Sequence, residues 1–143
     1  MVISRCLMSF LVLVLVFFSP LPARCEEKLA PAQIMMAYTN ISVQMKNLAC
    51  ALDMYKTDNK RYPGSLSQIY PTYLKKPSDT MKDSYFTYLP SQNGQSFQLQ
   101  FNQGAPPGVK VPGGYPRYDS TKAAIEYMPG ITDFEAFLRK ITW

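Results

Sequence analysis

The sequence contains no histidine among its 143 residues. Without an imidazole, the chain has no histidine general base, no histidine metal ligand and no Ser-His-Asp triad. Paired carboxylates can still act as acid and base, and the nearest pair, Asp79 and Asp83, lies beside Lys82 in a linker. No glycine-rich phosphate loop follows a predicted strand. The composition therefore favours a protein that is not an enzyme and has no cofactor or metal, over a small envelope hydrolase using Asp79 and Asp83.

Charge is also sparse, because only 17% of the residues are charged and the formal net charge is +5. The longest basic run after the N-terminal segment is Lys75-Lys76, and no stripe of arginines appears. Nucleic-acid-binding surfaces need such a basic stripe. The sequence therefore predicts no nucleic-acid partner.

No hydrophobic run is long enough to cross a bilayer as a helix, which takes about 20 residues. The apolar run Leu7 to Phe18 follows Arg5 and leads into small residues, which is typical of a secretory signal. We expect cleavage after Cys25 or after Ala23, so that residues 1–25 form the signal and residues 26–143 one exported domain, periplasmic or secreted. An uncleaved anchor is the alternative, and only a retained N-terminal segment would bring the protein to a membrane.

Cysteine is scarce, and the three residues are Cys6, Cys25 and Cys50. Cys6 belongs to the predicted signal. If a helix begins near Pro31, Cys50 lies roughly 28 Å along it, whereas the lead back to Cys25 spans at most roughly 20 Å. We therefore expect Cys50 to be a free thiol or a small apolar residue, unpaired with Cys25.

A long amphipathic helix is predicted over residues 31–58. Pro31 suits a first helical turn. Apolar residues then recur at alternating intervals of four and three, forming one seam on a helix. This apolar seam consists of Ile34, Tyr38, Ile41, Met45, Leu48, Leu52 and Tyr55.

A second stripe lies on the opposite side of the same helix: Met36, Val43 and Cys50 recur every seven residues, and Met54 lies beside them. One interpretation is that these four residues contact a partner protein, a membrane surface or another part of the chain. The other is that a wide core-facing surface wraps around the helix, since polar residues such as Asn40 and Asn47 interleave.

The remaining elements are short. A capping-box pattern, Ser65 with Gln68, predicts a helix over 65–74. Alternating apolar residues on both sides of Asn93-Gly94 predict a β-hairpin over 84–101, with Phe97, Leu99 and Phe101 packed on the helix seam. Residues 104–118 are rich in glycine and proline and are predicted to form a surface loop. Thr132 and Glu135 predict a C-terminal helix over 132–141. The fold class is α+β: a long N-terminal helix packed on a small antiparallel sheet, with a short second helix and a short C-terminal helix.

The middle of the chain resembles the type IV pilins and the pseudopilins of type II secretion. The stretch "ALDMYKTDNKRYP" resembles the family signature at the end of the long helix, and "YLKKPSD" resembles the segment that follows it. The matching residues are Ala51, Leu52, Tyr55, Asp58, Asn59, Tyr62 and Pro63, then Tyr73, Leu74, Lys75, Lys76, Pro77 and Asp79. The resemblance covers about Ile34 to Phe101 and implies a pilin-like fold.

The sequence also differs from this family. It shows no prepilin leader with a glycine cleavage site followed by phenylalanine and glutamate, and Asp119 and Asp133 are isolated where major pseudopilins carry an acidic calcium loop. The resemblance therefore concerns the soluble domain. It implies a protein that contacts other proteins of an envelope secretion or pilus-type assembly, with Met36, Val43, Cys50 and Met54 as the partner face. The alternative is a secreted binding module or adhesin that uses the 104–118 loop through Tyr115, Arg117 and Tyr118.

Overall fold

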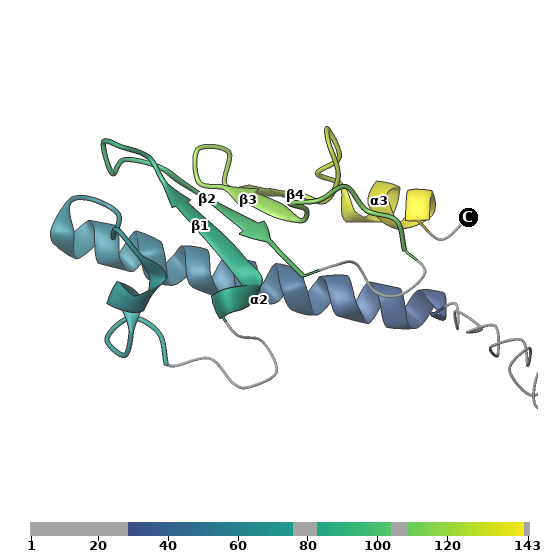
Figure 1. The fold of residues 1–143 in the computed structure, drawn as a ribbon, viewed down its shortest axis with the longest axis horizontal. Helices are drawn as coiled ribbons and strands as arrows, with labels where there is room; N and C mark the ends of the chain where they lie inside the picture. The colour runs from purple at the N-terminus through teal and green to yellow at the C-terminus, as the bar shows by residue number, and fades with distance from the viewer. Residues whose placement is uncertain (1–28, 76–82, 104–108, 142–143) are drawn as a thin grey trace, which may run out of the picture.

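The computed structural model describes residues 29–75, 83–103 and 109–141. Helix α2 (Pro31–Asn59) lies along a four-stranded antiparallel sheet, and helix α3 (Phe134–Ile141) follows the last strand (Figure 1). Two short 3-10 helices, η1 (Leu66–Ile69) and η2 (Asp83–Tyr85), precede the sheet. This arrangement confirms the α+β prediction. No helix within these ranges has the length and hydrophobicity to cross a membrane, and the predicted signal lies outside the described residues.

Helix α2 matches the predicted helix to within one residue at its end. Pro31 occupies the first turn, where a missing backbone N–H costs no hydrogen bond. The helix ends where Lys60 takes a left-handed conformation (φ 64°), with its N–H donating to the Lys56 carbonyl at 2.7 Å. The seam is buried from Ile34 to Leu52, and Tyr55 is half-buried. The spacing of apolar residues therefore determined both the helix and the face that it buries.

The sheet has the order β1 (Phe86–Pro90), β2 (Phe97–Phe101), β3 (Arg117–Asp119) and β4 (Ala124–Glu126), with antiparallel pairing throughout. The β1–β2 hairpin is the predicted one, with Tyr88 opposite Leu99. Gly94 in its turn has φ +63°, and a Cβ atom there would lie 3.2 Å from Arg61 Cβ. The positive φ therefore favours glycine at this position, and Arg61 leaves little room for a side chain.

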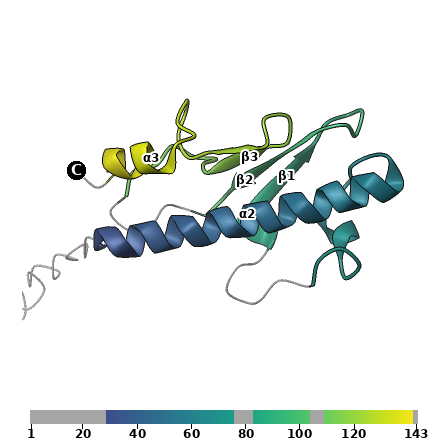
Figure 2. The same cartoon turned by 180° about the vertical axis from the view of Figure 1, so that it is seen from behind.

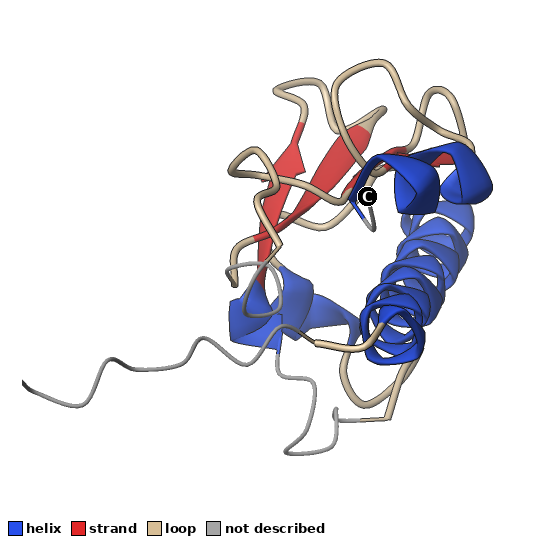
Figure 3. Cartoon of the chain, turned by 90° about the vertical axis from the view of Figure 1, so that its right-hand side faces the viewer, coloured by secondary structure: helices blue, strands red, loops and turns tan. Residues whose placement is uncertain are grey.

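The hairpin contributes its predicted apolar face to the core. Phe97, Leu99 and Phe101 are buried, whereas Gln98 and Gln100 between them are only half-buried. These residues belong to one hydrophobic cluster with the seam of α2. Seen along the helix, the sheet lies to one side of α2 (Figure 3). The predicted packing of the hairpin on the seam is confirmed.

Helix α3 packs close to the N-terminal half of α2 (Figure 2). The buried Phe137 ring lies edge-on to the Tyr38 ring, with 4.7 Å between their centroids, and stacks on Tyr127 at 5.2 Å. The Ser42 hydroxyl, buried beside them, donates to the Tyr38 carbonyl at 2.7 Å and lies 3.1 Å from the Tyr127 hydroxyl. These contacts join the C-terminal segment to α2, and burial raises the pKa of Tyr38 to about 12.

Two predicted helices are shorter than expected. The one predicted over 65–74 is the single 3-10 turn η1, and its capping box does not form: Gln68 Oε1 accepts from the Gly64 N–H at 2.8 Å, while the Ser65 hydroxyl bonds to Ser67. The C-terminal helix begins at Phe134, and Asp133 Oδ1 caps it by accepting from the Glu135 N–H at 3.0 Å. Asp133, a better-placed side chain than Thr132, therefore sets the start of that helix.

Candidate functional site

The second stripe lies on the side of α2 that faces away from the sheet. Met36 is 63% exposed, Val43 52% and Met54 51%, and Cys50 is an exposed free thiol. At 100° per residue, Val43 stands opposite Ile34 and Leu52 of the buried seam. A wide core-facing surface is therefore the wrong interpretation of the stripe, because the core does not reach it.

A shallow hollow of about 420 Å³ adjoins the C-terminal part of this stripe. It lies between α2 and the end of the β3–β4 hairpin, and the stripe contributes Cys50 and Met54 to it. One charge of each sign, Lys46 and Asp53, stands on its helix side. The full lining is Lys46, Ala49, Cys50, Asp53, Met54, Thr57, Tyr118 and Ala123. The exposed face of α2 thus combines apolar side chains, a hollow and a pair of opposite charges.

The signature residues that carry the family resemblance are engaged inside the domain. The Tyr62 hydroxyl donates to Asp53 Oδ1 at 2.6 Å, and its ring lies edge-on to Phe97 with 4.7 Å between centroids. Burial first, and the hydrogen bond to Asp53 second, raise the pKa of Tyr62. Pro63 is fully buried, and its carbonyl accepts from the Tyr88 hydroxyl at 2.8 Å. This part of the signature fastens the end of α2 to the hairpin.

The rest of the signature fastens α2 to the segment after η1. The rings of Tyr55 and Tyr73 meet edge to face at 5.5 Å, and the Tyr73 hydroxyl donates to Asp58 Oδ2 at 2.9 Å. Asn59 Nδ2 donates to the Tyr55 carbonyl at 2.9 Å. Asp58 thus accepts from a tyrosine that lies 15 residues away in sequence. The signature residues therefore hold the C-terminal end of α2 in place within the domain.

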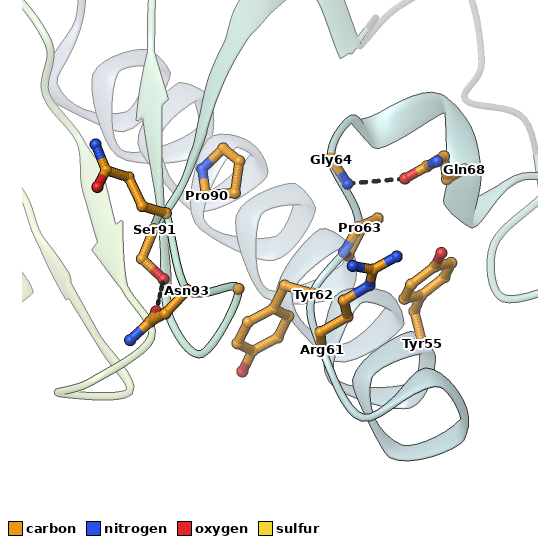
Figure 4. Close-up of a pocket in the computed structure, with 11 residues that line it drawn as sticks. Tyr55, Arg61, Tyr62, Pro63, Gly64, Gln68, Pro90, Ser91 and Asn93 are labelled. Atoms are coloured by element: carbon orange, nitrogen blue, oxygen red, sulfur yellow. Dashed lines mark hydrogen bonds between the residues drawn. The ribbon is translucent and has the colours of Figure 1, made fainter.

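A polar hollow of about 370 Å³ lies beside this junction, between the end of α2 and the β1–β2 turn (Figure 4). Arg61 is the only charged residue that lines it, and Gln68 and Asn93 contribute amides. The lining residues are Tyr55, Arg61, Tyr62, Pro63, Gly64, Gln68, Pro90, Ser91, Gln92, Asn93 and Gly94. Sequence reasoning missed this hollow, because no local signal shows that the Asn93-Gly94 turn packs against Arg61.

Residues 104–108 of the predicted ligand loop lie outside the described residues, and residues 109–116 form neither helix nor strand, as predicted. The end of the loop is not arranged as expected. Arg117 and Tyr118 belong to strand β3, where a loop was predicted, and Tyr118 is buried against Phe97. Tyr115 is half-buried beneath the Arg117 guanidinium, 5.2 Å from it. None of the three is the freely exposed side chain that the prediction required. Pairing of β3 with β2 and β4 explains the difference, because it turns the end of the glycine- and proline-rich segment into a sheet strand.

Arg117 is further engaged by an ion pair with Glu126 on the neighbouring strand, at 2.6 Å between Nη2 and Oε2. That hydrogen bond raises the pKa of Arg117. The Gly130 N–H, which donates to Glu126 Oε1 at 2.6 Å, and then Arg117 lower the pKa of Glu126. These groups therefore form a cross-strand pair that ties β3 to β4.

Metal-binding clusters are not found in the described ranges. No three histidine, cysteine, aspartate or glutamate side chains gather there as metal ligands. Of the two candidate carboxylates, Asp79 lies outside the described residues, and Asp83 is described only as the backbone of η2. The pairing of Asp79 with Asp83 therefore stays a prediction.

No protein-family model matches the chain, and no curated protein or solved structure matches it either. The class of domain is defined by the architecture alone: an α+β domain with one long helix on a four-stranded antiparallel sheet and a short C-terminal helix. Its most distinctive surface is the exposed face of α2.

Proposed function

We propose that this chain is an exported, non-enzymatic, pilin- or pseudopilin-like protein of the periplasm or cell exterior. It acts through protein–protein contacts in an envelope secretion or pilus-type assembly. The proposal rests on the secretory-type N-terminus and on the signature residues from Ala51 to Pro63. It uses no cofactor and no metal, and its partners are proteins rather than nucleic acids.

The observation that carries the proposal is the exposure of the second stripe. A domain of this size hides its large apolar residues where it can. Among the described residues, three of the five exposed large hydrophobic side chains, Met36, Val43 and Met54, share one face of one helix. Grouped apolar exposure of this kind is typical of protein interaction surfaces. The contacts of the signature residues support the same view, since they join the C-terminal end of α2 to the rest of the domain and leave that face exposed.

A photo-reactive amino acid at position 43 of the full chain tests the proposal in native host cells. We expect intermolecular products that contain position 43. The matched control places the same group at Gln92, which is exposed in the β1–β2 turn, and should give few such products. If position 43 gives only intramolecular products in cells that hold the native assembly, the proposed function is wrong.

The binding-module alternative stays a prediction. The side chains on which it depended are used within the fold, since Tyr118 is buried and Arg117 pairs with Glu126. No observation of the described residues favours it over the α2 face.

A further inference from the structure

The exposed face of α2 has a heptad pattern, which the apolar spacing alone does not reveal. Met36, Val43 and Cys50 recur every seven residues, and Asn40, Asn47 and Met54 recur at the same interval between them. All six residues are exposed. Two such interleaved rows are the a and d positions of a helix that packs lengthwise against another helix, and asparagine at such positions specifies register. The face is therefore shaped for a helix.

The charges beside this pattern indicate which helix would fit it. Lys46 and Asp53 are seven residues apart on one flank of the face, and the opposite flank carries Asp58 near its end. In an antiparallel pair of identical helices, equivalent flanks face each other, so that Lys46 meets Asp53 twice. In a parallel pair, opposite flanks meet, which would place Asp53 beside Asp58 of the second copy. Charge complementarity favours the antiparallel pair.

We propose that the second stripe packs against a second copy of this chain, helix α2 to helix α2, in an antiparallel two-fold pair. This inference rests on the proposed function, because it names the occupant of the same face. The register places Val43 opposite Met54 of the second copy, and Asn47 opposite Cys50. Asn40 then lies opposite Thr57 of the second copy, whose hydroxyl can accept a hydrogen bond.

The same register places Lys46 within reach of Asp53 of the second copy. Lys46 lies about 3 Å along the helix axis from Asp53 of the second copy, at 1.5 Å per residue, and its four-carbon side chain spans that offset. The hollow beside Cys50 and Met54 gives the pair room, because both charged residues line it. Asp53 keeps its bond to Tyr62 through Oδ1 and offers Oδ2 to the lysine.

The overlap is short, about 22 residues or roughly 33 Å of helix. An interface of one helix width over that length belongs to the smallest class of specific contacts, so we expect a dissociation constant on the order of tens of micromolar. A symmetric pair of this kind is closed, because the same face is used on both copies.

Disulfide formation measures the register directly in the full chain. In a Cys50→Ser background, Val43→Cys and Met54→Cys proteins are mixed in equal amounts and oxidised, and we expect heterodimers linked through positions 43 and 54. Val43→Cys alone is the matched control. In the antiparallel register its two copies are about 16 Å apart, too far for a disulfide. All three substituted positions are exposed, so we expect every variant to fold. Circular dichroism checks this.

A charge exchange tests the same pair without cysteines. Lys46→Asp and Asp53→Lys should each weaken self-association by about tenfold in sedimentation equilibrium, and the double variant should restore it. Self-linkage of Val43→Cys alone would show a parallel pair and overturn the inference, as would a wild-type monomer at several hundred micromolar. If the purified chain is monomeric but position 43 still cross-links to a different protein in cells, the second copy is wrong and the proposed function stands.

Discussion

The Tyr62→Phe substitution tests whether the signature residues stabilise the fold. The substitution removes one hydroxyl and keeps the ring against Phe97. The lost bond to Asp53 is 2.6 Å long and has a charged acceptor, a type that contributes about 1.5–3 kcal/mol when well shielded. Because the Asp53 side chain is exposed, we expect less than this, a loss of about 1–1.5 kcal/mol.

Urea unfolding of the purified chain measures this loss. With a slope of about 1.5 kcal/mol per molar urea, the midpoint should fall by roughly 0.7–1 M. Tyr62→Ala, which also removes the buried ring, should cost about 3–5 kcal/mol. Asp53→Ala in both backgrounds completes a double-mutant cycle, and the coupling should equal most of the Tyr62→Phe loss. An unchanged midpoint for Tyr62→Phe, together with lost cross-linking at position 43, would refute the structural role of the signature.

Further outcomes follow from other parts of the fold. Phe137→Ala should lower the free energy of unfolding by about 3–5 kcal/mol in urea titrations, because the ring anchors α3 to Tyr38; an effect below 1 kcal/mol would contradict that docking. Glu126 and Asp119 have lowered pKa values in the fold, from the Gly130 N–H and Thr121 respectively. Their stabilisation is complete above about pH 5 and should be lost as the pH falls towards 3, seen as a falling urea midpoint. Val43→Ser should change the free energy of unfolding by less than about 0.5 kcal/mol while weakening self-association, and a large loss of stability would show that Val43 is a core residue.

The long helix and the hairpin could be predicted because each has a strong local signal. The apolar seam of α2 repeats over many turns, and Asn93-Gly94 marks the hairpin turn in the sequence itself. Strand β3 could not be predicted in the same way. It has three residues, too few to show alternation, and it is held by pairing with β2, far away in sequence. Tyr118 was therefore taken for a loop residue.

The candidate site could be predicted only in part, because the sequence shows the spacing of its residues but not their exposure. The seven-residue spacing of Met36, Val43 and Cys50 can be read from the sequence, but a spacing does not say whether the core extends to it. Only the position of the sheet on the other side of α2 decides that these residues are exposed. The hollow beside Arg61 depends on contacts between segments about thirty residues apart, which no local pattern encodes.

Cys50 can show, without any substitution, whether a partner covers the second stripe, because its free thiol lies within that stripe. Maleimide labelling, followed by mass spectrometry of the peptide that contains Cys50, measures how much of this face is uncovered. We predict fast labelling in dilute purified protein and labelling about tenfold slower in the native envelope, where a partner present at ten times the dissociation constant leaves about a tenth of the face free. Equally fast labelling in both settings would mean that nothing covers the face, and would contradict the account.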